Sequence, residues 1–144
     1  MSIPLPEQIF ITREAWQDEM SAKVRKRLGH LPIRMIDSVE ELENSKDLLA
    51  WQAYGLSKRS LLLTHYKGEW LKPCPGTGGH VCCNLWVVNA AEGCPFDCTY
   101  CYLQGYLQRV QAQKLYTNVD EMKSAIAKRV EREPKRLFRI CTGE

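Results

Sequence analysis

The sequence lacks long hydrophobic runs: nowhere in its 144 residues do apolar residues approach the roughly 18 in succession that a membrane-spanning helix needs. The segment from Met1 to Pro6 lacks the basic and apolar regions of a secretory signal peptide. Internal repeats and low-complexity tracts are also absent from the sequence. We therefore expect a cytoplasmic protein with no membrane partner.

The sequence also has only a small excess of positive over negative charge. The formal net charge of +3 is too small to identify a nucleic-acid partner. The glycines of Gly76-Thr77-Gly78-Gly79 are not followed by the Gly-Lys-Ser/Thr of a phosphate-binding P-loop, so that site is excluded. The hydrophobic content of 44% and charged content of 26% are typical of a globular domain.

Cysteine, in contrast, is plentiful. Seven cysteines cannot all pair with one another, and without a secretion signal they are more often metal ligands than disulfides. Cys94, Cys98 and Cys101 lie in one short segment, where Gly93 and Pro95 force the chain to turn. Thiolates select soft metal centres such as iron–sulfur clusters, zinc or Cu(I). Because cluster cysteines usually come in fours, a group of three would leave one iron of a [4Fe–4S] cluster open.

The spacing Cys-x3-Cys-x2-Cys, with the aromatic Tyr100 just before the last cysteine, resembles the signature of radical S-adenosylmethionine enzymes. The segments that narrow the resemblance run from Cys98 to Gln104, from Tyr116 to Glu121 and from Cys141 to Glu144. In order and approximate spacing they resemble the spore photoproduct lyase family of DNA-repair, photolyase-like enzymes. The clear resemblance covers roughly the last third of the chain, and the first 70 residues are similar only in their general layout of strands and helices.

The resemblance implies that a [4Fe–4S] cluster binds S-adenosylmethionine at its open iron. One electron, from a donor such as a flavodoxin or ferredoxin, would cleave the cofactor to methionine and a 5′-deoxyadenosyl radical. That radical would start a lyase-type repair of a UV thymine photoproduct in DNA. The implied cluster ligands are Cys94, Cys98 and Cys101.

Further roles follow from the same resemblance. Tyr100 occupies the aromatic position near the adenine of the cofactor. A packed core tyrosine is the other interpretation, and the two are not exclusive. Thr142-Gly143-Glu144 resembles the Gly-Gly-Glu motif that binds the methionyl amino group. Backbone carbonyls and a carboxylate can accept hydrogen bonds from such an amine.

Cys141 matches the cysteine proposed as hydrogen donor to the thymine product radical, a role that suits a weak S–H bond. A structural cysteine is the alternative interpretation. The segment departs from the family because Gly143 and Glu144 stand where the spore enzymes have an acidic-serine ending. A radical enzyme acting on another substrate therefore stays open.

Local patterns predict an α/β fold. The opening reads as strand–helix–strand, with Thr12 capping the helix and Gly29 ending it, and the end reads as strand, cysteine loop, helix, strand in a parallel crossover. Another helix is expected to be capped by Asn118. Strands are expected at 8–12, 33–37, 61–66, 85–89 and 137–141, and helices at 12–28, 40–49, 102–114 and 118–133.

With the resemblance, this order implies two parts. Residues 1–80 form an N-terminal strand–helix extension, and residues 81–144 begin a partial (β/α)6-type radical S-adenosylmethionine barrel with its first βαβ unit. Such a barrel needs about six strand–helix units of roughly 30 residues each. We therefore expect a truncated N-terminal fragment that is inactive by itself.

Other cysteines leave alternatives open. Cys74, Cys82 and Cys83 could hold a second metal or supply a fourth ligand to the main cluster. They could equally be small buried thiols or have an auxiliary redox role, since adjacent residues on a strand point apart. A different class of protein is a structural zinc module, in which Cys83 or His80 completes a four-ligand set.

Basic residues give weaker signals. Lys58 and Arg59 are interpreted as charges at a strand edge. A second group could meet DNA phosphates, but interrupting glutamates favour a solvated helix face. That group is Lys128, Arg129, Arg132, Lys135 and Arg136.

Overall fold

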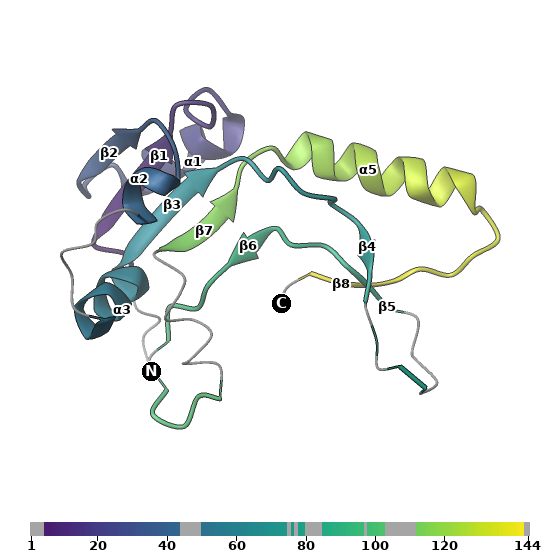
Figure 1. The fold of residues 1–144 in the computed structure, drawn as a ribbon. Helices are drawn as coiled ribbons and strands as arrows, with labels where there is room; N and C mark the ends of the chain where they lie inside the picture. The colour runs from purple at the N-terminus through teal and green to yellow at the C-terminus, as the bar shows by residue number, and fades with distance from the viewer. Residues whose placement is uncertain are drawn as a thin grey trace.

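The computed structural model describes residues 5–43, 50–74, 76, 78–79, 85–96, 98–102 and 112–142. Two sheets organise these residues, as Figure 1 shows: a five-stranded sheet and, at the other end of the molecule, a three-stranded sheet. Cys82, Cys83, His80, Gly143 and Glu144 lie outside the described residues, so the expectations that involve them stay predictions.

The larger sheet has the strand order β2-β1-β3-β7-β6. Strands β1, β2, β3 and β7 are parallel, and β6 is antiparallel to β7. Short apolar runs explain most of these strands, because a parallel sheet is buried on both faces. Their bounds are β1 Gln8–Thr12, β2 Ile33–Ile36, β3 Ser60–Thr64, β6 Ala91–Glu92 and β7 Gln113–Tyr116.

The smaller sheet has the order β4-β5-β8 and consists of β4 Lys72–Pro73, β5 Leu85–Val87 and β8 Arg139–Cys141. Strands β5 and β8 are parallel, with Trp86 opposite Ile140 and Val87 opposite Cys141. The expected parallel pairing of these two strands is therefore confirmed. The connection between them passes through β6 and β7 of the larger sheet, which ties the two sheets together.

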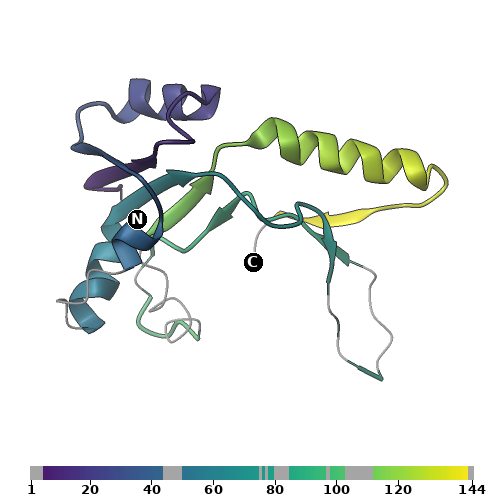
Figure 2. The ribbon, with the colours of Figure 1, turned by 45° about the horizontal axis from the view of Figure 1, so that its top comes forward.

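Helices cover the sheets and connect them. Helix α1 lies over one face of β1 and β3, whose Ile9, Ile11 and Leu63 are fully buried beneath Val24 and Leu28. Helix α5 leads from the end of β7 to β8 and so bridges the two sheets (Figures 1 and 2). The bounds are α1 Glu19–Leu28, α2 Glu40–Glu43, α3 Ala50–Arg59 and α5 Val119–Arg132.

The aromatic cluster under α5 joins the two sheets. It contains Trp70 and Trp86 from the smaller sheet's side and Tyr116 from the end of β7. The Tyr66 ring lies 4.7 Å from the Trp70 ring and 4.9 Å from the Tyr116 ring. Large aromatic rings in such tilted contacts bury much apolar area, and this burial stabilises the packing of α5 against both sheets.

Two expected helix starts are wrong in detail. Helix α1 begins at Glu19 with Asp18 at the N-cap position, because Thr12 is already buried at the end of β1. Asn118 does occupy the N-cap position of α5, but its side chain makes no capping bond. The Asn118 amide instead accepts from Tyr66 N at 2.9 Å and donates to Tyr66 O at 3.1 Å.

Three elements differ from the sequence prediction. Gln113 and Lys114 lie in strand β7, so the helix expected over 102–114 is wrong at its end. The remainder of that range, 103–111, lies outside the described residues. Helix α3 was not predicted, and the helix expected over 40–49 is described only for Glu40–Glu43. Strands β3 and β7 pair in register from Leu61 opposite Gln113, a partnership that local sequence does not encode.

The expected α/β fold class is confirmed. The five-stranded sheet takes strands from both sides of residue 80, since β6 and β7 pair with each other and β7 pairs with β3. No helix in the described part of the chain is long and apolar enough to cross a membrane.

Candidate functional site

The cysteine loop, residues 93–102, follows β6 and is described except for residue 97. Gly93 begins it with φ at +92°, a left-handed conformation that suits glycine. Because β6 is antiparallel to β7, the loop runs toward the amino ends of β7 and β3. The expected direct passage from the strand at 85–89 into the loop is wrong, because β6 lies between β5 and the loop and pairs with β7 of the larger sheet.

Cys94, Cys98 and Cys101 are all partly buried and none of them forms a disulfide. The amide of Cys101 donates to Cys98 O at 3.1 Å, so the last two cysteines lie in one tight turn. Reduced, partly accessible thiols on a single turn are the donor set that iron–sulfur clusters and other soft metal centres take.

The donor chemistry therefore fits a [4Fe–4S] cluster, but the geometry is not preassembled. Among the residues that the structure describes, no three Cys, His, Asp or Glu side chains lie close enough together to hold a metal ion. Ligand convergence would accompany metal binding, as in other sites where metal and local folding are coupled.

Lys58 fixes the first part of the loop. Its Nζ atom, on the last turn of α3, donates to Cys94 O at 2.8 Å and to Phe96 O at 2.9 Å. The residue is only 9% exposed. The interpretation of Lys58 as an edge charge is therefore wrong. Its partner Cys94 lies 36 residues further along the chain, so the local sequence around Lys58 does not indicate the contact.

Two tyrosines of the loop face solvent. Tyr100 is 90% exposed and Tyr102 is 98% exposed. The alternative of Tyr100 as a packed core residue is excluded by that exposure. An exposed ring at the loop tip is available to stack on a flat ligand.

The carboxyl end of β8 lies beside the chain that leads into the cysteine loop. Val88 N donates to Cys141 O at 2.9 Å, directly after Val87 pairs with Cys141. Cys141 is partly buried and not in a disulfide, and Thr142 follows it in an exposed position. The end of β8 therefore contacts the chain at Val88, which precedes β6 and the cysteine loop.

The remaining described cysteine, Cys74, is tied to the small sheet. Its amide donates to Leu85 O at 2.9 Å, next to the pairing of β4 with β5. The thiol is partly buried and not in a disulfide. The second metal site predicted from Cys74, Cys82 and Cys83 stays a prediction, because the other two lie outside the described residues.

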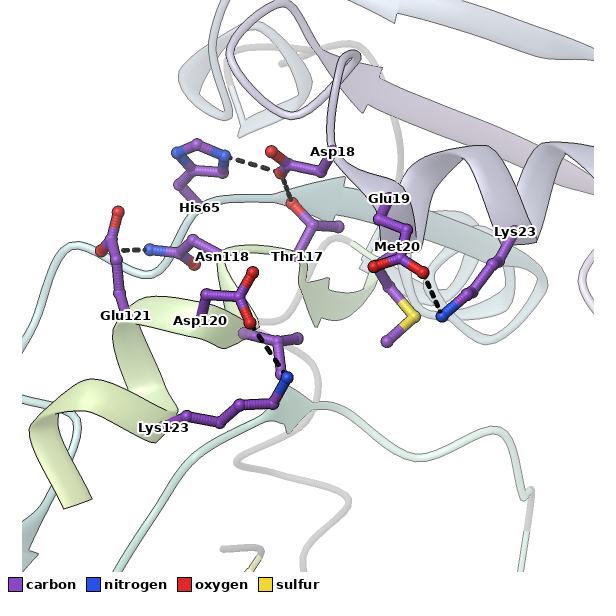
Figure 3. A pocket seen from close by; sticks show the side chains of 11 residues that line it. Asp18, Glu19, Met20, Lys23, His65, Thr117, Asn118, Asp120, Glu121 and Lys123 are labelled. Atoms are coloured by element: carbon purple, nitrogen blue, oxygen red, sulfur yellow. Dashed lines mark hydrogen bonds and ion pairs between the residues drawn. The ribbon is translucent and has the colours of Figure 1, made fainter. Parts of the chain in front are cut away.

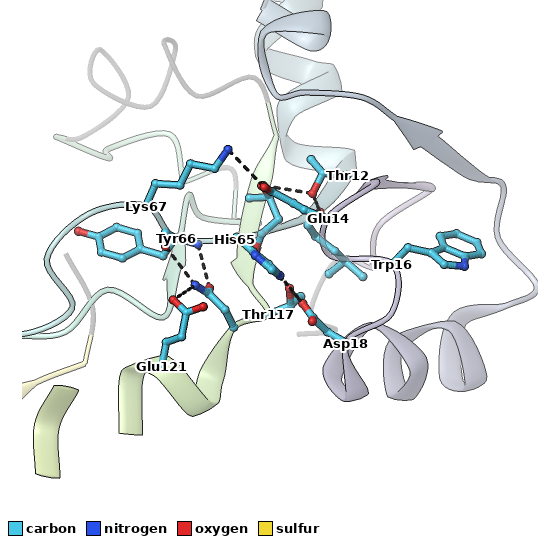
Figure 4. A network of polar contacts seen from close by, with 12 residues as sticks. Thr12, Glu14, Trp16, Asp18, His65, Tyr66, Lys67, Thr117 and Glu121 are labelled. Atoms are coloured by element: carbon cyan, nitrogen blue, oxygen red, sulfur yellow. Dashed lines mark hydrogen bonds and ion pairs between the residues drawn. The ribbon is translucent and has the colours of Figure 1, made fainter. Parts of the chain in front are cut away.

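A polar cluster that the sequence analysis missed lies at the carboxyl ends of β3 and β7, the opposite edge of the larger sheet. His65 Nε2 lies 2.7 Å from Asp18 Oδ2, and the Thr117 hydroxyl donates to the same oxygen (Figures 3 and 4). Asn118 donates to Glu121 Oε2 at 2.8 Å beside them. These residues line a hollow of about 250 Å³.

Charges around that hollow are matched in pairs. Lys23 binds Glu19 at 2.7 Å, and Lys123 binds Asp120 at 2.9 Å (Figure 3). The hydrogen bond from Lys23 is the main cause that lowers the pKa of Glu19. The hydrogen bond to Asp120 is the main cause that raises the pKa of Lys123. The cluster therefore joins α1, β3 and α5 as a set of internal contacts.

The basic segment of α5 is partly committed to internal contacts. Glu133 binds Arg129 at 2.5 Å and Arg136 at 2.7 Å, and the hydrogen bond from Arg136 is the main cause that lowers the pKa of the Glu133 carboxyl. The two guanidinium groups lie 4.6 Å and 5.3 Å from the Trp86 ring. Lys128 and Arg132 are exposed, in agreement with the solvated-face interpretation.

No protein-family model matches the sequence, and no curated protein matches it either. Solved structures do share its fold. One is a spore photoproduct lyase mutant with bound AdoMet and dinucleoside spore photoproduct, at 19% identity and a TM-score of 0.75, covering 99% of this chain and 41% of that one. A second spore photoproduct lyase mutant is 17% identical, with a TM-score of 0.77 and the same coverages. The complex of that lyase with dinucleoside spore photoproduct is 18% identical, with a TM-score of 0.71, and covers 96% of this chain and 40% of that one.

The likeness establishes the fold, which is that of part of a spore photoproduct lyase. The chain spans about two fifths of the length of these structures, 41% in the first. The structural likeness covers 99% of this chain, whereas the sequence motifs resemble that family only in the last third.

Proposed function

We propose that the chain forms part of a radical S-adenosylmethionine enzyme. The observation that supports this most directly is the cysteine loop: Cys94, Cys98 and Cys101 are partly buried thiols outside any disulfide in one short loop, and the last two lie on one turn. In this proposal Cys94, Cys98 and Cys101 hold a [4Fe–4S] cluster. When bound together, the cluster and S-adenosylmethionine supply one-electron cleavage of a carbon–sulfur bond in the cofactor.

The residues of the chain bind and orient the cofactor. Lys58 holds the carbonyls of the loop and so places Cys94. The exposed Tyr100 ring covers the adenine by stacking, which also excludes water from that side. Thr142, Gly143 and Glu144, at the end of β8, accept hydrogen bonds from the methionyl amino group.

The proposed substrate is a UV thymine photoproduct in DNA. Its support is the shared fold, because spore photoproduct lyase structures with that fold have bound dinucleoside spore photoproduct. Cys141 then donates a hydrogen atom from its Sγ atom to the thymine product radical, which leaves a thiyl radical on Cys141. Its partly buried place at the end of β8 suits this role, since a small side chain there leaves room for a ligand.

Anaerobic reconstitution with iron and sulfide tests the cluster on this chain. We expect about four irons per chain and an EPR spectrum of the reduced protein that S-adenosylmethionine alters. Cys98→Ala should lose both signals. Cys74→Ala is the matched control because that thiol lies on the small sheet, and it should keep both.

Two outcomes would contradict the proposal or its ligand assignment. Stoichiometric zinc with no iron would overturn the proposal and identify a structural zinc module. Equal iron loss in Cys74→Ala and Cys98→Ala would place the ligands elsewhere. Repair itself is tested on the complete protein with UV-irradiated, spore-photoproduct-containing DNA and a one-electron donor.

A further inference from the structure

Lys58 is a buried residue that contacts the cysteine loop but none of the proposed reacting groups. A lysine ammonium that is 9% exposed is costly unless hydrogen bonds replace its water. Those bonds come from the cysteine loop: Nζ donates to Cys94 O at 2.8 Å and to Phe96 O at 2.9 Å. Hydrogen bonds to a charged donor are about twice as strong as neutral ones.

The two carbonyls lie on either side of Pro95, so one ammonium closes the turn around that residue. Gly93 begins the turn in a left-handed conformation. Pro95 cannot supply an amide to stabilise the turn from within. The turn that carries Cys94 is therefore closed from outside, by a donor on a different element.

The anchor itself is held on the sheet. Gln113 Nε2, at the start of β7, donates to the backbone carbonyl of Lys58. Glu7 N donates to Arg59 O at 2.7 Å, and Ser60 pairs with Gln8 as β3 begins. Because these contacts hold the backbone at Lys58 and Arg59 against β1 and β7, the Lys58 side chain holds the cysteine loop at a fixed place relative to the sheet.

We propose that Lys58 is a positioning residue for the cysteine loop, which sets the backbone of Cys94 and places a positive charge beside the ligand turn. Its importance to metal binding rests on the proposed function, in which Cys94 is a ligand. Partners behind metal ligands typically change metal affinity about tenfold to a hundredfold when removed. A fixed positive charge also favours the more negative, reduced form of a thiolate-bound cluster.

Hydrogen exchange of the metal-free chain tests the positioning directly. In Lys58→Met the amides of 94–101, among them the Cys101 amide bonded to Cys98 O, should exchange about tenfold faster or more, the amides of β1 and β3 staying protected. Arg59→Met is the matched control, with the same charge change on the next residue of α3, whose side chain is 53% exposed. It should leave the loop unchanged.

Iron release then tests the consequence. From reconstituted chains, a chelator should remove iron about tenfold faster in Lys58→Met than in Arg59→Met. The midpoint potential should also shift to more negative values in Lys58→Met alone. Lys58→Arg keeps charge and donors, and it should restore most of the loop protection.

Unchanged loop exchange in Lys58→Met would overturn the inference, whatever the wild-type chain binds. Faster loop exchange in a chain that binds no iron would support the positioning and refute the proposed function. If Lys58→Met unfolds β1 as well, Lys58→Gln takes its place, since it is polar but lacks the charge and the length to make both hydrogen bonds that Lys58 makes. Equal exchange of 94–101 in Lys58→Gln and wild type would then overturn the inference.

Discussion

His65, at the carboxyl end of β3, contacts the Asp18 carboxylate through its Nε2 atom at 2.7 Å. The Thr117 hydroxyl donates to the same oxygen from the end of β7, so one carboxylate holds three segments together (Figure 4). Both side chains of the His65–Asp18 pair are 25% exposed, which weakens competition from water.

Asp18→Ala should therefore lower the free energy of unfolding by about 1–3 kcal/mol, because two donors lose their acceptor. Urea denaturation measures the change. Asp37→Ala is the control, since Asp37 forms an ion pair with Arg13 in which both side chains are more than 70% exposed, at 73% and 77%. That variant should lose less than about 1 kcal/mol. Equal losses in both variants would contradict a joining role for Asp18.

Tyr116 should make the fold sensitive to alkaline pH. Burial raises the pKa of the Tyr116 phenol far above its ordinary value of 10.0, and a hydrogen bond with Glu92 raises it further. The unfolded chain loses this proton near pH 10 whereas the folded chain retains it. The free energy of unfolding should therefore fall as the pH rises above that value.

Tyr116→Phe should remove this part of the pH dependence, so its stability should fall less steeply above pH 10 than that of the wild type. Denaturation curves at successive pH values measure the slopes. Tyr100→Phe is the control because Tyr100 is 90% exposed, and it should keep the wild-type slope. Parallel slopes in Tyr116→Phe and the wild type would refute the assignment.

Much of the fold could be predicted because short apolar runs in the sequence indicate which segments form buried strands. Gln8–Thr12 and Ile33–Ile36 are strands in the structure as expected, and their alternation with a helix predicts the parallel order that they show. The three cysteines of the loop could be proposed as ligands from their spacing, since soft-metal chemistry depends on residue type and proximity along the chain, and this assignment stays a prediction.

The remainder depends on contacts that are distant in sequence. Only Leu115 and Tyr116 of β7 are large and apolar, and its strand form depends on pairing with β3 and β6. Thr117 reaches Asp18 from 99 residues away. In the sequence Lys58 is indistinguishable from a solvent-exposed basic residue at a helix end, because its contact with Cys94 O depends on the tertiary fold. Such partners carry no periodic signal, so pattern analysis assigns them to the surface.

Arg129 should act in stability rather than in binding phosphates. Its guanidinium lies 4.6 Å from the Trp86 ring and is paired with Glu133. Arg129→Met should lower the free energy of unfolding by about 1 kcal/mol, because the cation–π contact and the ion pair are both lost. Arg132→Met, on the exposed face of the same helix, should cost less than about 0.5 kcal/mol. A larger loss in Arg132→Met, measured by urea denaturation, would contradict this division.

Cys141 separates hydrogen donation from cluster binding. Because it lies on β8, with its backbone paired to Val87 and Val88, Cys141→Ala should leave the iron content and the EPR response to S-adenosylmethionine unchanged. In the complete protein the same variant should still consume S-adenosylmethionine with damaged DNA but yield far less repaired thymine. Loss of iron would make Cys141 a ligand, and an unchanged yield of repaired thymine would make it a structural residue. Iron counting and product chromatography on one preparation distinguish these outcomes, because only a hydrogen donor separates cofactor consumption from repair.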